Sequence, residues 1–415
     1  MRETRQYLPR PAVSPPENGG AIYFPGVGSG GVKTQSTRLD GLGTTIFAEM
    51  SALALRTGSV NLGQGFPDTD GPASVIEAAV HALQHGRNQY APGIGVPELR
   101  EAVSTHQKRW YGLDVDPDTQ VAVSTGATEA IAAALLGLVD PGDEVVVLEP
   151  YYDSYVAVIQ MAGGVRRPVT LRAPDFRLPI DELRAAVTPR TTAILLNSPH
   201  NPTGAVLSRE ELEAVADVAR EHDLVVITDE VYEHLTYDVP HIPIATLPGM
   251  AERTLTISSG GKTFSFTGWK VGWATGPAAL VGAMVGAKQF MTYTSGAPLQ
   301  PAIAQALDLG DEYFDALRAR MESQRDLLCE GLDAIGFDVF VPEGGYFATT
   351  DIRPLGYDDG VEFCRVLPEL AGVVAIPHQV FYDHKDIGRP LVRWAFSKKP
   401  KVIDEAVRRL GVLRR

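Results

Sequence analysis

Cysteine is almost absent from this chain of 415 residues, because Cys329 and Cys364 are the only two. Two thiols are too few for a disulfide framework or for a metal site built from thiolates. The nine histidines show no ligand spacing such as H-E-x-x-H, so no metal site is expected. An oxidising compartment is not indicated, and we expect a cytoplasmic protein.

Positive charge and long apolar runs are also in short supply. The chain has 37 Lys and Arg against 51 Asp and Glu, a formal net charge of −14. Such a protein does not attract nucleic acid or an anionic membrane, so neither is expected as a partner. No apolar run approaches the roughly 18 to 20 residues of a membrane span. The start of the chain lacks the apolar core of a secretory signal.

The organisation of the chain is read from its periodicity. Residues 1–37 are rich in Pro, Gly and Ser and show none, which predicts a disordered or loosely docked arm. We assign 38–74 to an N-terminal segment that contributes to a small domain and to the entrance of an active site. A large domain is predicted over 75–300 and a small C-terminal α+β domain over 301–415, beginning with one long helical stretch up to residue 336.

Within 75–300, apolar runs alternate with helical patterns. The runs are EVVVLEP (144–150), TAILLNSP (192–199), LVVITDE (224–230) and RTLTISSGG (253–261), and an amphipathic segment such as 208–222 lies between two of them. Continuous apolar strands that alternate with helices indicate an α/β fold with a mostly parallel sheet covered on both faces.

Polar side chains follow these strands, where ligands of such sheets bind. Tyr152 follows the first run and Asn201 the second. Asp229 lies at the end of the third run with Tyr232 just after it, and Lys262 follows the fourth. An aromatic face, an amide, a carboxylate with a phenol, and a lysine therefore meet at one edge. This arrangement predicts a ligand site built from several strands.

The stretch ISSGGKTFSFTGWKVGW (257–273) contains a GKT that looks like a nucleotide-binding phosphate loop. That motif needs a glycine six residues before the lysine, where Thr256 stands. A second GKT-like sequence at 26–34 has one extra residue between Gly31 and Lys33. A nucleotide hydrolase is therefore disfavoured by spacing.

Lys262 is better interpreted as a lysine that forms a Schiff base. Burial and the nearby cation of Lys270 are expected to lower its pKa and free the amine. Pyridoxal phosphate also needs a partner for its pyridine nitrogen, which Asp229 could supply, and donors for its ring oxygen, which Asn201 and Tyr232 could supply. Tyr152 could stack on the ring.

The segment STGATEAIAAALL (124–136) is a glycine-containing turn that opens a helix. The N–H groups of Gly126 and Ala127 could bind phosphate there, although a purely structural turn explains the same residues equally well.

Taken together, several motifs resemble the class I and II aminotransferases, which are fold-type I pyridoxal-phosphate enzymes. The motifs are NSPHNPTG (197–204), TDEVYEHL (228–235), the 257–273 stretch and VRWAFSKK (392–399). NLGQGFPD (61–68), NQYAPGIGVPELREAV (88–103) and GVVAIPHQVFYD (372–383) further resemble the branch of kynurenine/glutamine, methionine and N-succinyldiaminopimelate aminotransferases. The resemblance runs from about residue 38 to the end.

This resemblance implies roles for matching residues. Lys262 would hold the cofactor and act as base and acid, Ser259 and Lys270 would bind the phosphate, and Arg393 would clamp the substrate carboxylate with help from Gly65 and Asn201. Tyr90 would reach the phosphate of a neighbouring subunit, which implies a homodimer with shared sites. Phe47 and Tyr293 would line the side-chain pocket, where many relatives have Trp and Phe.

Other residues near the motifs are expected to be structural. His200 is interpreted as a loop residue, Glu230 and Glu233 as solvated or structural groups, and Trp269 and Trp273 as packing residues.

The predicted reaction moves an amino group from an amino acid to a 2-oxo acid, with 2-oxoglutarate as the expected acceptor. The donor stays open among N-succinyldiaminopimelate, which overall resemblance favours, methionine, glutamine, kynurenine and aromatic amino acids. A β-lyase with the same Lys262 site is an alternative. A non-catalytic regulator is a weaker one, because no DNA-binding module is evident.

Overall fold

Seven strands form the central sheet of the structure, a computed structural model that describes residues 36–43 and 45–414. The predicted arm at 1–37 and the sequence at 26–34 therefore lie almost entirely outside the described residues. The strand order is β2 (Val121–Ser124), β8 (Gly272–Thr275), β7 (Thr254–Ser259), β6 (Val225–Asp229), β5 (Thr191–Asn197), β3 (Glu144–Glu149) and β4 (Val165–Thr170). Only β8 runs antiparallel to its neighbours, so the prediction of a mostly parallel sheet is confirmed.

Helices cover both faces of this sheet. Alternate residues of β3 enter two different cores: Val145 and Val147 pack on one face, and Val146 and Leu148 on the other. Both faces being buried explains why the strand reads as a continuous apolar run. The first face is covered by α4 (Gly126–Leu138), α5 (Asp153–Ala162) and α9 (Ala278–Lys288), and the second by α6 (Ile180–Ala186) and α7 (Arg209–Glu221).

The start of α7 shows how the sequence sets a helix boundary. Ser208 accepts a hydrogen bond from the backbone N–H of Glu211, whose side chain accepts one from the N–H of Ser208, so two free donors of the first turn are satisfied. Apolar residues recur along one face beyond this cap and meet the sheet. The helix predicted within 208–222 is confirmed over Arg209–Glu221.

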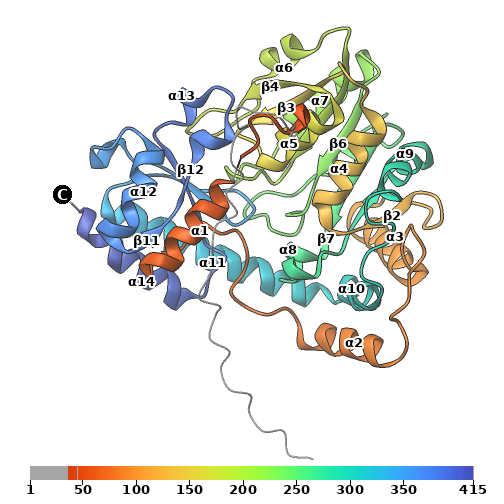
Figure 1. Cartoon of the computed structure of the whole chain (residues 1–415), viewed down its shortest axis with the longest axis horizontal. Helices are drawn as coiled ribbons and strands as arrows, with labels where there is room; N and C mark the ends of the chain where they lie inside the picture. The colour runs from red at the N-terminus through yellow and green to blue at the C-terminus, as the bar shows by residue number, and fades with distance from the viewer. Residues whose placement is uncertain (1–35, 44, 415) are drawn as a thin grey trace, which may run out of the picture.

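A second, four-stranded antiparallel sheet is formed mainly by the C-terminal part of the chain. Its order is β12 (Ile376–Pro377), β13 (Leu391–Ala395), β10 (Phe347–Asp351) and β9 (Asp338–Phe340). Around it pack α1 (Ile46–Thr57), α12 (Gly360–Ala371) and α14 (Pro400–Leu410). The short strands β1 (Val60–Asn61) and β11 (Val373–Val374) pair in parallel. In Figure 1, α1 accordingly lies beside the blue C-terminal helices and far from α2 (Ala73–Gln84), the next helix in sequence.

The long helix predicted from residue 301 is broken in two. The structure has α10 (Gln300–Leu307) and α11 (Asp311–Ile335), separated at Asp308 to Gly310. Gly310 takes an extended conformation as the N-cap of α11, which ends the continuous helical pattern. Phe314 near the start of α11 packs with α10, α2 (Ala73–Gln84) and α3 (Pro97–Tyr111), whereas Leu317 and later residues pack with the C-terminal sheet. The domain boundary at residue 300 stays a prediction.

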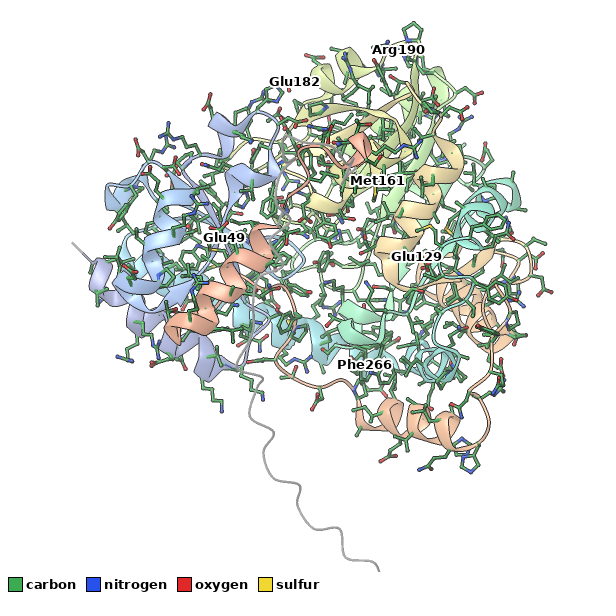
Figure 2. All side chains as sticks on the ribbon, in the orientation of Figure 1. Glu49, Glu129, Met161, Glu182, Arg190 and Phe266 are labelled. Carbon is green, nitrogen blue, oxygen red and sulfur yellow. The ribbon has the colours of Figure 1, made fainter. Side chains whose placement is uncertain are left out.

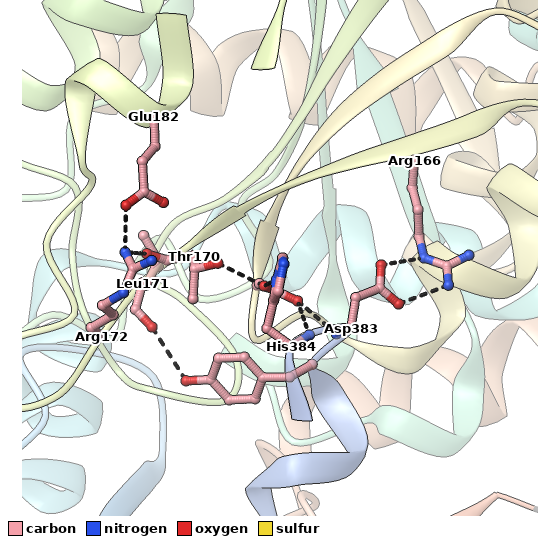
Figure 3. Close-up of polar contacts among 9 residues, drawn as sticks. Arg166, Thr170, Leu171, Arg172, Glu182, Asp383 and His384 are labelled. Carbon is pink, nitrogen blue, oxygen red and sulfur yellow. Dashed lines mark hydrogen bonds and ion pairs between the residues drawn. The ribbon is translucent and has the colours of Figure 1, made fainter. Parts of the chain in front are cut away.

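Polar contacts join the two sheets at the end of β3. Glu149 is fully buried; it accepts hydrogen bonds from the Thr170 hydroxyl at 2.7 Å and the Asp383 N–H at 2.6 Å, and pairs with the imidazole of His384. Arg166 forms a two-pronged ion pair with Asp383, at 2.6 and 2.7 Å (Figure 3). These contacts attach the loop before α13 (Lys385–Gly388) to the large sheet.

In the described part of the chain, no helix combines the length and apolar character needed to cross a membrane.

Candidate active site

A cavity of about 370 Å³ opens at the carboxyl edge of the large sheet, between the two parts of the molecule. Asn197, Asp229 and Ile257 are paired in register across β5, β6 and β7, so these strand ends are level. This explains why residues far apart in sequence meet here. Every predicted site residue except Tyr90 and Tyr293 lines the cavity, namely Phe47, Gly65, Gly126, Ala127, Tyr152, Asn201, Asp229, Tyr232, Ser259, Lys262, Lys270 and Arg393.

Lys262 lies in the short helix α8 (Gly260–Thr263), directly after β7. Its Nζ is 3.5 Å from the carbonyl oxygen of Gly65, 5.4 Å from the centre of the Tyr346 ring and 5.7 Å from that of Tyr232. Burial lowers the pKa of Lys262, but Tyr346, Tyr152 and Asp229 raise it, and the net direction is upward. The expectation of a lowered pKa is therefore wrong for the free amine, because phenol and carboxyl oxygens, not only cations, surround it.

Asp229 ends β6 and is 5% exposed. Burial raises its pKa to about 6, against an ordinary value of 3.8. One carboxylate oxygen accepts a hydrogen bond from the Tyr155 hydroxyl at 2.7 Å, and the other accepts one from the N–H of Val231 at 3.3 Å. A carboxylate held in this way on the cavity wall suits a partner that carries a proton or positive charge.

Arg393 enters the cavity from β13 of the other sheet and is 1% exposed. Its guanidinium donates to the side-chain oxygen of Asn201 and to the carbonyl of Gly63, both at 2.9 Å. The ring of Phe347 lies 3.9 Å below its centre, with Phe47 at 5.0 Å. Burial lowers its pKa to about 10, so the group is still charged at neutral pH, while its Nε–H has no partner.

The start of α4 forms an anion cradle beside Lys270. Gly126 has φ +76°, and a Cβ there would come within 3.0 Å of the Lys270 Nζ, so a side chain would fill the cradle. The neighbouring Gly272 allows an equally close approach, because its Cβ would lie 2.6 Å from the Gly126 carbonyl carbon. The N-cap Thr125 makes no side-chain cap, and its buried hydroxyl has no partner. The first-turn N–H groups at Gly126 and Ala127 therefore face the cavity free for an anion.

These residues fit pyridoxal phosphate on chemical grounds. Lys262, Lys270 and Arg393 gather three cations around one cavity in a protein whose net charge is −14. The glycine cradle suits a phosphate, the unpaired Arg393 Nε–H suits a carboxylate, and Asp229, which lines the same cavity, suits a protonated nitrogen. No single strand end supplies the three cations, the glycine cradle and the carboxylate together. Few ligands other than pyridoxal phosphate would use all of these groups at once.

Comparison with known proteins agrees with this site. Residues 57–410 match the family model described as "Aminotransferase class I and II". The chain belongs to the class I and II aminotransferases. It is an enzyme that depends on pyridoxal phosphate and acts on amino acids and oxo acids.

Individual relatives of this aminotransferase match along nearly their whole length. It is 54% identical over 389 residues to a probable N-succinyldiaminopimelate aminotransferase of Mycobacterium tuberculosis, covering 91% of this chain and 98% of the relative. A solved structure of the N-succinyldiaminopimelate aminotransferase from that organism aligns with a TM-score of 0.90 and 55% identity, over 91% of this chain and 100% of that one. The methionine aminotransferase of Escherichia coli is 39% identical over 382 residues, covering 91% and 98%.

Tyr90 and Tyr293 are the two predicted site residues that lie outside the cavity. They are 85% and 50% exposed, and their rings meet edge to face at 5.6 Å. The expectation that Tyr293 lines the pocket is not met within its own chain, since the loop after α9 directs it to the surface. The role of Tyr90 across a subunit boundary stays a prediction.

Asn197, which holds the N–H of Asn201, belongs to a strand end that the sequence did indicate. Other residues of the aminotransferase site escaped sequence reasoning: Tyr155 holds Asp229, and Tyr346 and Phe347 lie at the start of β10 in the C-terminal sheet. The strand-end rule applies only to the parallel sheet, so it could not find the last two. The glycine pair before them, in EGGYF (343–347), was the available signal.

Residues that were expected to be structural are buried or partly buried and pack inside the molecule. His200 is 3% exposed and contacts the Thr203 hydroxyl at 2.8 Å; burial lowers its pKa to about 3. Trp273 is 2% exposed in a hydrophobic core, and Trp269 stacks on Phe266 at 3.9 Å. Glu230 and Glu233 are 2% and 5% exposed, so the structural alternative holds and the solvated one is wrong.

Glu233 also belongs to the one group in the described residues with metal-like spacing, together with His106 and His234. The two imidazole Nε2 atoms are 2.8 Å apart, which is a hydrogen-bond distance, and both Glu233 oxygens already accept hydroxyl hydrogen bonds, from Tyr111 and Ser258 at 2.6 Å. The histidine-spacing rule missed this cluster, because its members come from two segments. That the protein has no metal site stays a prediction.

Proposed function

We propose that this aminotransferase takes the amino group of an N-succinylated diamino dicarboxylic acid, N-succinyldiaminopimelate, and passes it to 2-oxoglutarate. The observation that carries the reaction type is that Lys262, Asp229 and Arg393 line the same cavity. The choice of donor is supported by the relative of that activity, 54% identical over 91% of the chain. Two cysteines, both buried and free, fit a reducing cytoplasm.

Pyridoxal phosphate, when bound, supplies a carbon that links to an amino group and a ring that accepts electrons from the substrate. Lys262 Nζ would hold the cofactor in the resting enzyme, then take the proton from the substrate Cα and return it to the adjacent cofactor carbon. Asp229 would keep a proton on the pyridine nitrogen, since its carboxylate is buried and orientated by Tyr155. Asn201 and Tyr232 would donate to the ring oxygen, and Tyr152 would cover the ring face.

The anionic ends of cofactor and substrate would be bound at opposite sides of the cavity. Lys270, Ser259 and the turn at Gly126 and Ala127 would hold the phosphate, as the glycine cradle suggests. Arg393 would hold the substrate α-carboxylate, assisted by Asn201 and Gly65. Its fork is already fixed by the Asn201 oxygen and the Gly63 carbonyl, so little side-chain freedom is lost on binding.

A homodimer with shared sites is part of the proposal. Tyr90 of each copy would reach the phosphate in the other, and Tyr293 would complete the substrate pocket there with Phe47 of the other chain. Their exposure on a single chain is consistent with this, because an exposed aromatic pair at a fixed position favours a protein partner.

The decisive experiment is a donor panel with purified enzyme and 2-oxoglutarate. N-succinyldiaminopimelate is expected to give the highest kcat/KM among the N-succinyl donor, methionine, glutamine, kynurenine and phenylalanine, with glutamate formed in equal amount. Lys262→Ala should abolish turnover and the visible absorbance of the lysine-bound cofactor. A preference for methionine or kynurenine would refute the proposed donor. Pyruvate and ammonia released without an oxo acid would refute amino transfer in favour of a β-lyase.

A further inference from the structure

Lys288 is a buried lysine outside the cavity. It is the last residue of α9 and is 1% exposed. Its Nζ donates to the carbonyl of Gly93 at 3.0 Å and to the carbonyl of Tyr293 at 2.8 Å. An ammonium group taken out of water destabilises the fold unless its hydrogen bonds are replaced. Here the replacement is two carbonyls on loops about 200 residues apart in sequence.

Gln300 connects the same two loops a short distance away and is fully buried. Its side-chain oxygen accepts the N–H of Val96 at 2.8 Å, and its amide nitrogen donates to the carbonyl of Ser295 at 3.2 Å. The two loops, 90–96 and 290–296, are therefore joined at two points by buried polar side chains. Both links run through backbone groups, so they fix the loop paths rather than particular side chains.

The aromatic pair, Tyr90 and Tyr293, stands on these joined loops. The rings meet at 5.6 Å and 83°, although Tyr90 is 85% exposed and would be free to rotate on an isolated loop. Tyr293 has φ +64°, a backbone conformation that a tyrosine adopts only when its surroundings hold it. The Lys288 bond to the Tyr293 carbonyl acts directly on that residue. Phe290 and Met291 beside it are 86% and 45% exposed, so the region is an apolar projection.

The same loop is also linked to the anion cradle of its own chain. The Thr292 hydroxyl donates to the carboxylate of Glu129, which accepts the N–H of Thr125 through its other oxygen. Glu129 lies on α4 (Figure 2), so one carboxylate joins the loop to the turn before Gly126.

We propose that Lys288 is a positioning residue that holds the aromatic pair in place for the active site of a second copy of this chain. The inference rests on the proposed homodimer with shared sites. It adds that Lys288 holds the shared residue, Tyr90, in the orientation that reaches the partner's phosphate. Without Lys288 one of the two links between the loops is lost, the Tyr293 carbonyl is no longer held, and Tyr90 loses the fixed orientation needed to contact the phosphate bound by the partner. The effect therefore appears in the partner's site, not in the site of the subunit that carries the change.

Hybrid dimers test this in trans. Subunits with Tyr90→Phe are mixed with Lys262→Ala subunits, so that the only site with a lysine is completed by a native Tyr90 from the other chain. Restored activity and restored affinity for pyridoxal phosphate are expected. When the second subunit carries both Lys262→Ala and Lys288→Met, restoration should fail, and cofactor binding at the lysine-bearing site should be about tenfold weaker. Lys108→Met, which changes an exposed lysine of α3, replaces Lys288→Met in the control hybrid.

Three outcomes separate the possibilities. Equal restoration with and without Lys288→Met would overturn the positioning role while leaving the shared site intact. A wild-type enzyme that is active as a monomer would overturn both the shared-site proposal and this inference. A wild-type enzyme that does not bind pyridoxal phosphate would instead overturn the proposed function. Gln300→Met in the same hybrid design removes the other link and should reproduce the loss, which covers the case that Lys288→Met does not fold.

Discussion

Asp229 lowers the stability of the folded protein at neutral pH, because its charged carboxylate is buried in the wall of the active site. Its folded pKa of about 6 lies above the ordinary 3.8, so between these values the folded state binds more protons than the unfolded state. Stability therefore falls as pH rises from about 4 to about 6, and the full penalty, about 3 kcal/mol, is present at pH 7. Below pH 4 both states are protonated, and the penalty is absent.

Asp229→Asn is accordingly expected to stabilise the cofactor-free protein at pH 7 by up to about 3 kcal/mol while removing most activity. The gain should be about half as large at pH 5. Urea unfolding of both proteins after removal of pyridoxal phosphate, at pH 5 and pH 8, measures it. Asp404→Asn, which changes an exposed carboxylate of α14, serves as the control. An Asp229→Asn variant of unchanged or lower stability at both pH values would contradict the raised pKa.

Arg393 gives a second prediction at this scale. Lysine keeps the charge but cannot reproduce two parallel donors, and it cannot reach Asn201 and Gly63 together. Arg393→Lys is expected to raise KM for the amino donor about 100-fold and to lower kcat much less, because the clamp binds substrate before and during the reaction. Steady-state kinetics measures both constants, with the exposed Arg353→Lys as control. A change confined to kcat would argue against a carboxylate clamp.

Residues at the ends of parallel strands were the ones that strand patterning could predict, whereas Arg393 on the antiparallel β13 was predicted only from the resemblance. Asp229 and Lys262 come at or just after the ends of apolar runs. In a parallel sheet such strand ends lie at the same edge, so the two residues could be placed near each other without knowing the strand order. Phe347 and Tyr346 could not be found in this way, since their sheet is antiparallel and reaches the cavity from the other side. The direction of the Lys262 pKa also escaped prediction, because it depends on Tyr346.

At the scale of elements, Glu149 connects the end of β3 to the loop that leads into α13. Figure 3 shows His384 and Asp383 meeting this strand end, with Arg166 on the far side of Asp383. The residue after Pro150, Tyr151, donates its N–H to the carbonyl of Phe381, whose ring lies 5.3 Å from the centre of Arg393. The bond between Tyr151 and Phe381 therefore helps to hold the Phe381 ring against Arg393, the proposed substrate clamp.

Glu149→Gln tests how much the buried contacts of Glu149 contribute to stability and to substrate binding. A carboxylate accepts every donor that points at it, whereas an amide turns an N–H group toward one of them, so a buried donor is left unpaired. We expect a loss of about 2 to 3 kcal/mol and a raised KM, because the loop that carries Phe381 loosens. Thermal unfolding and kinetics of the holoenzyme measure the two effects. Glu182→Gln, which changes the exposed partner of Arg172 in the same region, should change neither stability nor KM. If Glu149→Gln also changes neither, the contacts of Glu149 do not support the substrate clamp.

Element boundaries were predicted best where local chemistry marks them. The capping box of Ser208 and Glu211 starts α7 at Arg209, one residue after the start of the predicted segment at 208. The break between α10 and α11 was missed, since its only local sign is the LG pair at Leu309 and Gly310 inside an otherwise helical pattern. What decides it is tertiary: α10 packs against α3, while most of α11 packs on the C-terminal sheet.

At the scale of the whole molecule, the proposed site shared by two chains would tie activity to protein concentration. Tyr90 lies outside the cavity of its own chain, and Lys288 and Gln300 fix the loops that project it. The resemblance predicts a second subunit at the site, and that stays a prediction; it gave no sign of Lys288 on α9 or Gln300 on α10, because both residues lie outside the motifs.

Dilution should therefore lower the specific activity of the enzyme as dimers dissociate, and the affinity for pyridoxal phosphate should fall over the same concentration range. Because the phosphate contact from the partner is lost along with the subunit, added cofactor is expected to restore both activity and dimer mass in parallel. Measuring mass and initial rates on the same dilution series makes the link direct. A population that is monomeric by mass and retains full specific activity would show that each chain completes its own site, and that Tyr90 and Tyr293 serve some other surface.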